Sequence, residues 1–332
     1  MKGFANNNGV KIHFEVMGKG DVPLVLISGF GGDMDMWKYN AQELCRNFKI
    51  ILIDNRGIGQ SDKPDSAYSM EMFSSDIRSV LQEIGIESAY LLGVSMGGLI
   101  SLQFYKDYPE MVRGLILVST IAGIPKRFQP IARRIIKSHV YNFMTGFIIP
   151  GVNAMNKLVE KNKPSVGSLA ENFDIPTLDL NIINFLIGRK DISRLNKEEY
   201  LEMIFNYVVN IKNEKVLDYF EKRFSNKEKN GFNKDSQLEA VLSCSYDSLL
   251  SQLQVPTLII HGGLDKILNV NEAMYLNKSI KNSDLIIYGN CGHYLFLEQE
   301  ENFNNDISRY IRNWEEKKKA QKKAGKKSLL AG

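Results

Sequence analysis

Residues 89–108 read AYLLGVSMGGLISLQFYKDY and join a strand-like pattern directly to a helical one. The apolar run Ala89–Leu92 predicts a buried strand, and the pattern of Gly97–Tyr108 predicts a helix. Between them, residues 93–97 match the motif G-x-S-x-G. A serine in a sharp strand-to-helix turn is typical of a nucleophile elbow, so Ser95 is the predicted nucleophile. A buried serine in a glycine-rich packing turn is the alternative.

The spacing of this motif has a physical reason. A serine hydroxyl is a weak nucleophile unless a base takes its proton. The elbow is expected to hold Ser95 in a strained backbone conformation, so that its side chain projects above the sheet. Larger residues two positions away would clash there, which explains Gly93 and Gly97. The following helix would direct its N-terminal N–H groups towards developing negative charge.

Short apolar runs and helical patterns alternate on both sides of this stretch. This alternation predicts an α/β fold with a mostly parallel sheet, and a hairpin at Asn8-Gly9 predicts antiparallel edge strands. The last five strand-like runs lack polar alternation, which predicts that both of their faces are covered. The predicted strands are Lys11–Val16, Leu24–Ser28, Ile50–Asp54, Ala89–Leu92, Gly114–Val118, Thr257–His261 and Leu285–Tyr288; the helices are Met70–Ile84, Gly97–Tyr108, Asn271–Ile280 and Asn302–Trp314.

Residues 124–253 interrupt this alternation, because no convincing strand is found there. We interpret them as a helical lid inserted between two strands of one catalytic domain, which residues 1–123 and 254–316 form together. Apolar lid residues would line a substrate pocket or form the lid's own core. The predicted lid helices are Pro130–Tyr141, Leu178–Ile187, Lys197–Val209, Lys215–Phe224 and Gln237–Ser243.

Four histidines are the candidates for the base that would activate the serine. His13 and His261 lie in strand-like runs and are expected to be packed residues. His139 lies in the insertion, with no evident acid partner. His293 follows the last predicted strand, at the sheet edge where catalytic groups gather in open α/β folds. His293 is therefore the predicted base.

The acid that orients this histidine is expected between the serine and the histidine in the chain. Asp265 fits, because it follows the strand Thr257–His261 and precedes His293 by 28 residues. An Asx-turn or a helix cap is its alternative role. The loop Gly29-Phe30-Gly31-Gly32 follows another strand and lets backbone N–H groups approach a ligand. We assign the oxyanion donors to the N–H groups of Phe30 and Met96; a plain tight turn is the alternative.

Composition limits the class of protein. The 332 residues are 44% hydrophobic and 24% charged, which is typical of a globular protein. Seven of the 42 basic side chains are lysines after Glu316, so residues 1–316 carry a net charge of −3 and nucleic-acid binding is not expected. Three scattered cysteines, no signal-peptide pattern and no spanning apolar segment favour a cytoplasmic protein. The basic tail, residues 317–332, is interpreted as a solvated end.

Four blocks together resemble the α/β-hydrolase superfamily, specifically its esterase, lactonase and C–C-hydrolase-like members. The resemblance covers nearly all of residues 8–316 and implies a helical lid where the strands are missing. Two departures from the family are Ser28, where the oxyanion loop usually has histidine, and the large size of the lid. Met96 argues against prolyl aminopeptidases, which usually have tryptophan after the nucleophile. The blocks are Ser28–Gly32, Asp54–Asp62, Gly93–Gly98, and Pro256–Asp265 with Gly292-His293; Asp54–Asp62 is expected to buttress the oxyanion loop.

The resemblance and the motifs predict a serine hydrolase without cofactor or metal that acts on a small to medium apolar carboxylic ester. Ser95 argues against haloalkane dehalogenases and epoxide hydrolases, which use an aspartate at that position. Lactonases, thioesterases, perhydrolases and C–C hydrolases share the same triad and remain alternatives. A hydrolase-fold signalling protein that binds a ligand or a partner is another. A membrane or RNA adaptor acting through the basic tail is the third class.

Overall fold

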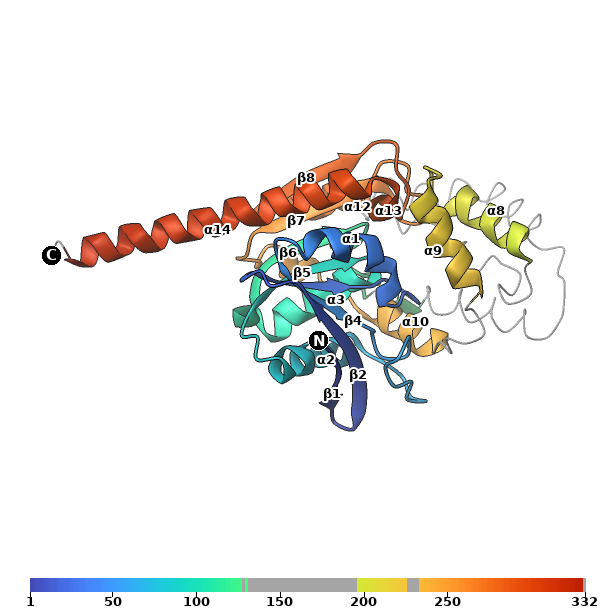
Figure 1. Ribbon diagram of the computed structural model, residues 1–332, viewed down its shortest axis with the longest axis horizontal. Coiled ribbons are helices and arrows are strands. Elements are labelled where there is room, and N and C mark those ends of the chain that lie inside the picture. The colour runs from blue at the N-terminus through green and yellow to red at the C-terminus, as the bar shows by residue number, and fades with distance from the viewer. Residues whose placement is uncertain (127–128, 131–195, 226–232, 331–332) are drawn as a thin grey trace.

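The computed structural model describes residues 1–126, 129–130, 196–225 and 233–330. Its centre is an eight-stranded sheet in the order β1-β2-β4-β3-β5-β6-β7-β8, seen in Figure 1. Strands β3 to β8 run parallel, and the β1–β2 hairpin joins antiparallel to β4, as predicted. The strands are β1 Lys2–Asn7, β2 Val10–Met17, β3 Pro23–Ile27, β4 Lys49–Ile53, β5 Ala89–Val94, β6 Val112–Val118, β7 Thr257–Gly262 and β8 Ser283–Tyr288.

Burial along the strands follows their position in the sheet. Every residue of β3, β5 and β7 is buried, as expected for central strands of a parallel sheet. For β8 the prediction of two covered faces is wrong, because this strand is half exposed along its length. The reason is its place at the sheet edge, where β7 is its only strand neighbour. Its apolar residues resembled those of a central strand, and a sequence run does not reveal the edge.

Helices cover both faces of the sheet. In Figure 1 the sheet lies between the contacting pair α2 and α3 and the contacting pair α1 and α14. Predicted helices correspond to α2 Met70–Glu83, α3 Met96–Asp107 and α12 Val270–Ser279. Short elements that were not predicted are η1 Met34–Trp37, α1 Lys38–Leu44, η2 Pro109–Met111 and α13 Leu295–Glu298.

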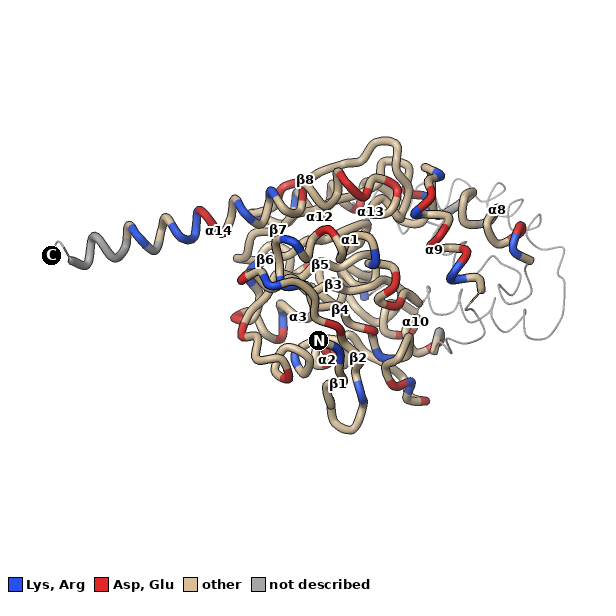
Figure 2. Tube along the Cα trace, viewed as in Figure 1, with Lys and Arg blue, Asp and Glu red and all other residues tan. Residues whose placement is uncertain are grey.

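The last helix, α14, is longer than predicted. It begins at Glu300 and continues to Leu330, although its apolar periodicity stops at Trp314. Lysine, alanine and glutamine are good helix formers, so the helix continues beyond Trp314. Figure 2 shows this lysine-bearing part of α14 projecting away from the body. Within the described ranges, every helix is too short or too polar to span a bilayer.

The described part of the insertion is helical, as predicted, and lies between β6 and β7 in the chain. It contains α8 Lys197–Tyr207, α9 Glu214–Ser225, α10 Lys234–Ser243 and the unpredicted α11 Asp247–Leu250. The predicted helices Pro130–Tyr141 and Leu178–Ile187 lie outside the described residues, apart from Pro130. Aromatic side chains of α8 and α9 pack on one another, for example Tyr200 on Phe220, and so form a core within the insertion.

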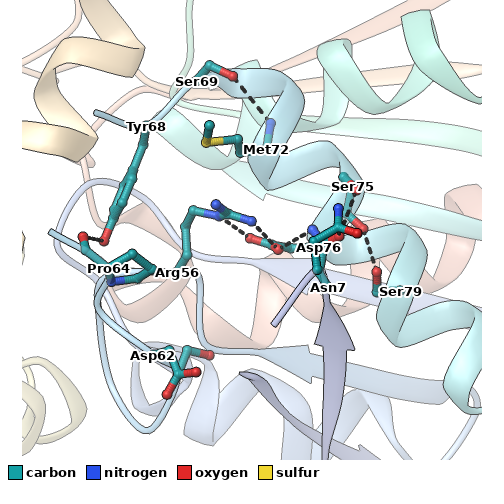
Figure 3. Close-up of polar contacts among 12 residues, drawn as sticks. Asn7, Arg56, Asp62, Pro64, Tyr68, Ser69, Met72, Ser75, Asp76 and Ser79 are labelled. Carbon is teal, nitrogen blue, oxygen red and sulfur yellow. Dashed lines mark hydrogen bonds and ion pairs between the residues drawn. The ribbon is translucent and has the colours of Figure 1, made fainter. Parts of the chain in front are cut away.

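A buried ion pair anchors the loop that follows β4. The Arg56 guanidinium makes two hydrogen bonds of 2.6 Å to the two carboxylate oxygens of Asp76 on α2. Asn7, at the end of β1, donates to the same carboxylate at 2.8 Å. Figure 3 shows this cluster, in which Arg56 lies between the loop and the helix. Burial raises the pKa of Asp76, and Arg56 opposes that rise. The cluster therefore ties Arg56, in the loop of residues 54–62, to α2 and to the end of β1.

Candidate active site

Ser95 lies in the turn between β5 and α3 and has a left-handed backbone, with φ of 54°. Such a conformation is rare for a residue with a side chain and costs about 1–3 kcal/mol. Two hydrogen bonds hold it. The Ser95 N–H donates to the carbonyl of Val118 at 2.9 Å, and the Thr120 hydroxyl donates to the Ser95 carbonyl at 2.6 Å. Ser95 thus has the strained strand-to-helix turn that its motif predicts.

Steric crowding requires glycine at both positions of the motif, Gly93 and Gly97. A Cβ atom on Gly93 would lie 2.1 Å from the carbonyl oxygen of Gly97. A Cβ atom on Gly97 would lie 2.3 Å from the carbonyl oxygen of Ile27, at the end of β3. Real Cβ atoms do not approach backbone this closely. The elbow therefore packs directly on β3, which places the loop after β3 beside Ser95.

His293 and Asp265 meet as the sequence predicts. The Nδ1 atom of His293 lies 2.7 Å from the Oδ2 atom of Asp265, and both residues are at least 91% buried. The other oxygen of Asp265 accepts the backbone N–H groups of Ile267 and Leu268 at 2.8 and 2.9 Å. Both oxygens of the Asp265 carboxylate therefore take part in hydrogen bonds. The bond at Nδ1 orients the ring of His293.

The surroundings of Asp265 keep it charged. Burial alone would raise the pKa of this carboxyl, but His293, His261 and a backbone N–H lower it below its ordinary value. Asp265 is therefore ionised at neutral pH. Burial lowers the pKa of His261, whose Nε2 atom lies 3.0 Å from the carbonyl of Leu268. His261 is consequently neutral, and it is packed as predicted.

The loop after β3 forms a tight turn beside the elbow. The Gly32 N–H donates to the carbonyl of Gly29 at 3.0 Å, and Gly31 has φ of 64°. A positive φ at the third position of a turn favours glycine. Met96 is the first residue of α3, so its N–H has no acceptor within the helix. The predicted oxyanion donors, Phe30 and Met96, both border the cavity described below.

The block Asp54–Asp62 was expected to support this loop, and two of its side chains bind backbone next to the loop. Asp54 accepts the backbone N–H of Met34 at 2.9 Å, and the Asn55 amide donates to the carbonyl of Ser28 at 3.1 Å. The other carboxylate oxygen of Asp54 lies 2.9 Å from the Nδ1 atom of His13. His13 is therefore a buried partner of Asp54 and lies outside the candidate triad.

A cavity of about 120 Å³ brings the predicted site residues together. Ser95 and His293 line it with both predicted oxyanion residues, and Leu238 and Val241 of α10 line it from the insertion. Asp265 is not among the lining residues, because it lies behind His293. None of the described lining residues is a lysine or an arginine. The full lining is Gly29, Phe30, Met36, Val94, Ser95, Met96, Leu99, Ile121, Leu238, Val241, Ile267, Leu268, His293 and Tyr294.

Sequence reasoning missed Glu298, which holds the loop carrying the histidine. Its carboxylate accepts three backbone N–H groups, from Gly292 at 2.9 Å, Asn210 at 2.9 Å and Ile211 at 2.7 Å. In addition, the His293 N–H donates to the carbonyl of Val208 at 2.8 Å. Burial raises the pKa of Glu298, and these N–H groups oppose the rise. An acid directly after the apolar run Leu295–Leu297 was the available signal.

Comparison with known proteins agrees with this architecture. Residues 22–300 match the family model described as alpha/beta hydrolase fold. The chain belongs to this family. A curated family relative, the AB hydrolase superfamily protein YisY of Bacillus subtilis (strain 168), is 25% identical over 304 residues, covering 91% of this chain and 95% of that protein. A 2-hydroxy-6-oxononadienedioate/2-hydroxy-6-oxononatrienedioate hydrolase of Burkholderia vietnamiensis (strain G4 / LMG 22486) is 26% identical over 309 residues, covering 91% of each.

Solved structures share this fold. An esterase from Exiguobacterium antarcticum superposes with a TM-score of 0.67 at 20% identity, over 94% of this chain and 100% of that one. A meta-cleavage product hydrolase from Pseudomonas fluorescens IP01 superposes with a TM-score of 0.66 at 20% identity, over 93% and 97% of the two chains. Family membership therefore supports a hydrolase. The similar proteins carry different names, among them an esterase and a meta-cleavage product hydrolase.

The elbow predicts a sharp difference between two glycine substitutions. Gly97→Ala would force its methyl group into the Ile27 carbonyl and should destabilise the protein by at least about 2 kcal/mol. Gly289→Ala is the matched control, because its Cβ would have nothing within 4 Å and should change stability by less than about 0.5 kcal/mol. Urea unfolding measures both, and equal midpoints would contradict the packing described here.

Glu298→Gln is predicted to loosen the His293 loop. The new amide nitrogen would face N–H donors in place of an acceptor, so at least one buried N–H loses its partner, at about 1–3 kcal/mol. Glu301→Gln, at an exposed position, should change stability by less than about 0.5 kcal/mol. Urea unfolding of the two variants tests this; if they unfold alike, Glu298 does not hold the loop.

Proposed function

We propose that this protein is a serine hydrolase that cleaves carboxylic esters through an acyl-enzyme. One observation carries the proposal. Ser95, on its strained elbow, opens onto the same cavity as His293, and the far nitrogen of that histidine is bound to the buried carboxylate of Asp265. This is the arrangement of nucleophile, base and orienting acid that acyl transfer requires.

In the proposed reaction, His293 takes the proton of Ser95 while the serine oxygen attacks the acyl carbon. Asp265 holds the imidazole with its Nδ1 proton directed away from the serine and stabilises the imidazolium that forms. The carbonyl oxygen gains the negative charge and receives the N–H groups of Phe30 and Met96. Each such donor typically contributes about 10²–10³-fold in rate.

The imidazolium then protonates the leaving alkoxide, and the alcohol departs. A water molecule loses a proton to His293 and attacks the acyl-enzyme, and the carboxylic acid leaves as Ser95 regains its proton. Three side chains and two backbone N–H groups supply every proton transfer and charge contact in this cycle. The proposed reaction therefore needs no cofactor or metal.

The cavity supports an apolar substrate of small to medium size. Its described lining is mainly Leu, Ile, Val and Met, and its volume is comparable to cavities of about 150 Å³ that hold one benzene molecule. Because Leu238 and Val241 contribute to this lining, we also propose that residues 124–253 act as a lid over a catalytic domain formed by residues 1–123 and 254–316.

A C–C bond hydrolase is the second candidate, because curated relatives at 25–26% identity over nine-tenths of the chain are named 2-hydroxy-6-oxononadienedioate/2-hydroxy-6-oxononatrienedioate hydrolases. Their named substrates are dicarboxylates, which need cationic partners when they are buried. The described lining of the cavity offers neither lysine nor arginine for this purpose. This observation favours an apolar ester over a dicarboxylate.

Ser95 is predicted to be the residue that reacts. A fluorophosphonate should label the protein once, and peptide mapping should place the label on Ser95. Ser95→Ala should lose both the label and the hydrolysis of p-nitrophenyl esters. Ser101→Ala is the matched control, because Ser101 is buried on the same helix and bonds the Gly97 carbonyl; it should keep both. A label on another residue, or full activity in Ser95→Ala, would show that Ser95 is not the nucleophile.

Substrate class is tested by a panel of p-nitrophenyl esters of increasing acyl length, lactones, acyl thioesters and a 2-hydroxy-6-oxodienoate. We expect kcat/KM to be highest for a short- or medium-chain ester and the enzyme to turn over many times, because the described cavity is small and apolar. A higher kcat/KM for the dienoate would favour C–C hydrolysis. A single turnover with every compound would favour a ligand-binding signalling role.

A further inference from the structure

Gln237 of α10 joins two backbone segments that lie far from it in the sequence. Its Oε1 atom accepts the N–H of Gly31 at 3.0 Å, and its Nε2 atom donates to the carbonyl of Arg56 at 3.0 Å. The residue is completely buried. The Gln237 amide can keep both hydrogen bonds only while the Gly31 N–H and the Arg56 carbonyl stay at fixed positions. Gln237 therefore sets the distance between the oxyanion loop and the loop after β4.

The Arg56 end of this bridge is itself fixed. The Arg56 side chain is held by two hydrogen bonds to Asp76, in the cluster shown in Figure 3. The Asp54 and Asn55 contacts tie the same segment to the backbone of Met34 and Ser28. Gln237 consequently has a rigid support on one side and acts on the turn of residues 29–32 on the other.

The contact falls next to a proposed oxyanion donor. The N–H of Gly31 belongs to the peptide unit that starts at the carbonyl of Phe30, so fixing that N–H fixes the rotation of the peptide plane after Phe30. The carbonyl of Gly31 accepts a hydrogen bond from Arg223 of α9. Both peptide units that flank Gly31 are therefore held by helices of the insertion.

We propose that Gln237 is a positioning residue, which orients the Phe30 N–H towards the oxyanion through the Gly31 peptide. In this way α10, with Arg223 of α9, controls the geometry of the oxyanion loop as well as covering the cavity. The N–H of Gly31 is engaged by Gln237 and is not a third oxyanion donor. The proposal rests on the proposed serine-hydrolase function.

A second buried glutamine, Gln103, provides a control that separates a positioning role of Gln237 from a purely structural one. Gln103 is 2% exposed, donates to Asp107 at 2.8 Å and accepts the Tyr246 hydroxyl at 2.9 Å. It ties the end of the insertion to α3 and makes none of its hydrogen bonds to the turn of residues 29–32. Gln103→Met should therefore lose stability to a similar degree as Gln237→Met without altering the oxyanion loop.

The test compares Gln237→Met and Gln103→Met in the full chain, each assayed below its own melting temperature. We expect kcat of Gln237→Met on a p-nitrophenyl ester to fall by about 10–100-fold with KM unchanged, since a small misplacement of a catalytic group has this effect. Affinity for an aryl trifluoromethyl ketone, which adds to Ser95 and places an oxyanion in the same site, should fall by the same factor. Gln103→Met should keep kcat and ketone affinity.

Gln237→Glu provides a second, pH-dependent readout. Its carboxylate can accept the Gly31 N–H but faces the Arg56 carbonyl without a proton to donate. Burial raises the pKa of such a carboxyl, so the group regains a donor as the pH falls. The ratio of kcat in this variant to kcat in the unchanged protein should therefore rise from pH 8 to pH 5.

Two outcomes would overturn the proposal. In one, Gln237→Met keeps the kcat and ketone affinity of the unchanged protein. In the other, Gln237→Met and Gln103→Met lose activity alike while the ratio for Gln237→Glu stays flat with pH. If Gln237→Met does not fold, Gln237→Glu decides alone. Failure of the proposed function is separate, because the unchanged protein would then neither bind the ketone nor hydrolyse the ester.

Discussion

The rest of the site depends on the close packing of the Ser95 elbow against the end of β3. A Cβ atom on Gly97 would lie 2.3 Å from the carbonyl oxygen of Ile27, so the helix that follows the serine packs directly on the strand that precedes residues 29–32. Ser95 adopts a left-handed backbone there at a cost of about 1–3 kcal/mol. Hydrogen bonds to Val118 and Thr120 offset part of that cost. The strain is what presents the hydroxyl to the cavity.

The insertion forms hydrogen bonds with two loops beside this elbow, the His293 loop and the turn of residues 29–32. Residues 208–211 bind the His293 loop, directly through the Val208 carbonyl and indirectly through Glu298. Helices α9 and α10 bind the Gly31 peptides through Arg223 and Gln237. Backbone positions on both sides of the cavity are thus fixed by a segment that lies outside the sheet. These bonds would give the proposed lid a role beyond the exclusion of water.

Sequence patterns predicted the mostly parallel sheet and placed Ser95, Asp265 and His293 in loops at strand ends, because a G-x-S-x-G turn and strand-end loops have local signatures. For example, the crowding around a strained serine explained why residues 93 and 97 are glycines. The catalytic roles of Ser95, Asp265 and His293 are proposals. The edge position of β8 and the continuation of α14 were not predicted, since exposure and the absence of a stop signal are not local apolar patterns. Glu298 and Gln237 were missed because their partners are distant backbone groups, up to 206 residues away.

Trapping the covalent intermediate tests the central claim most directly. The protein would be mixed with a p-nitrophenyl ester, quenched in acid within milliseconds and measured by intact-mass spectrometry, and the modified peptide would then be sequenced. The proposed chemistry predicts a mass increase of one acyl group on Ser95, formed together with a burst of one equivalent of p-nitrophenolate. Steady hydrolysis with no burst and no acylated protein, or an acyl group on a residue other than Ser95, would contradict it.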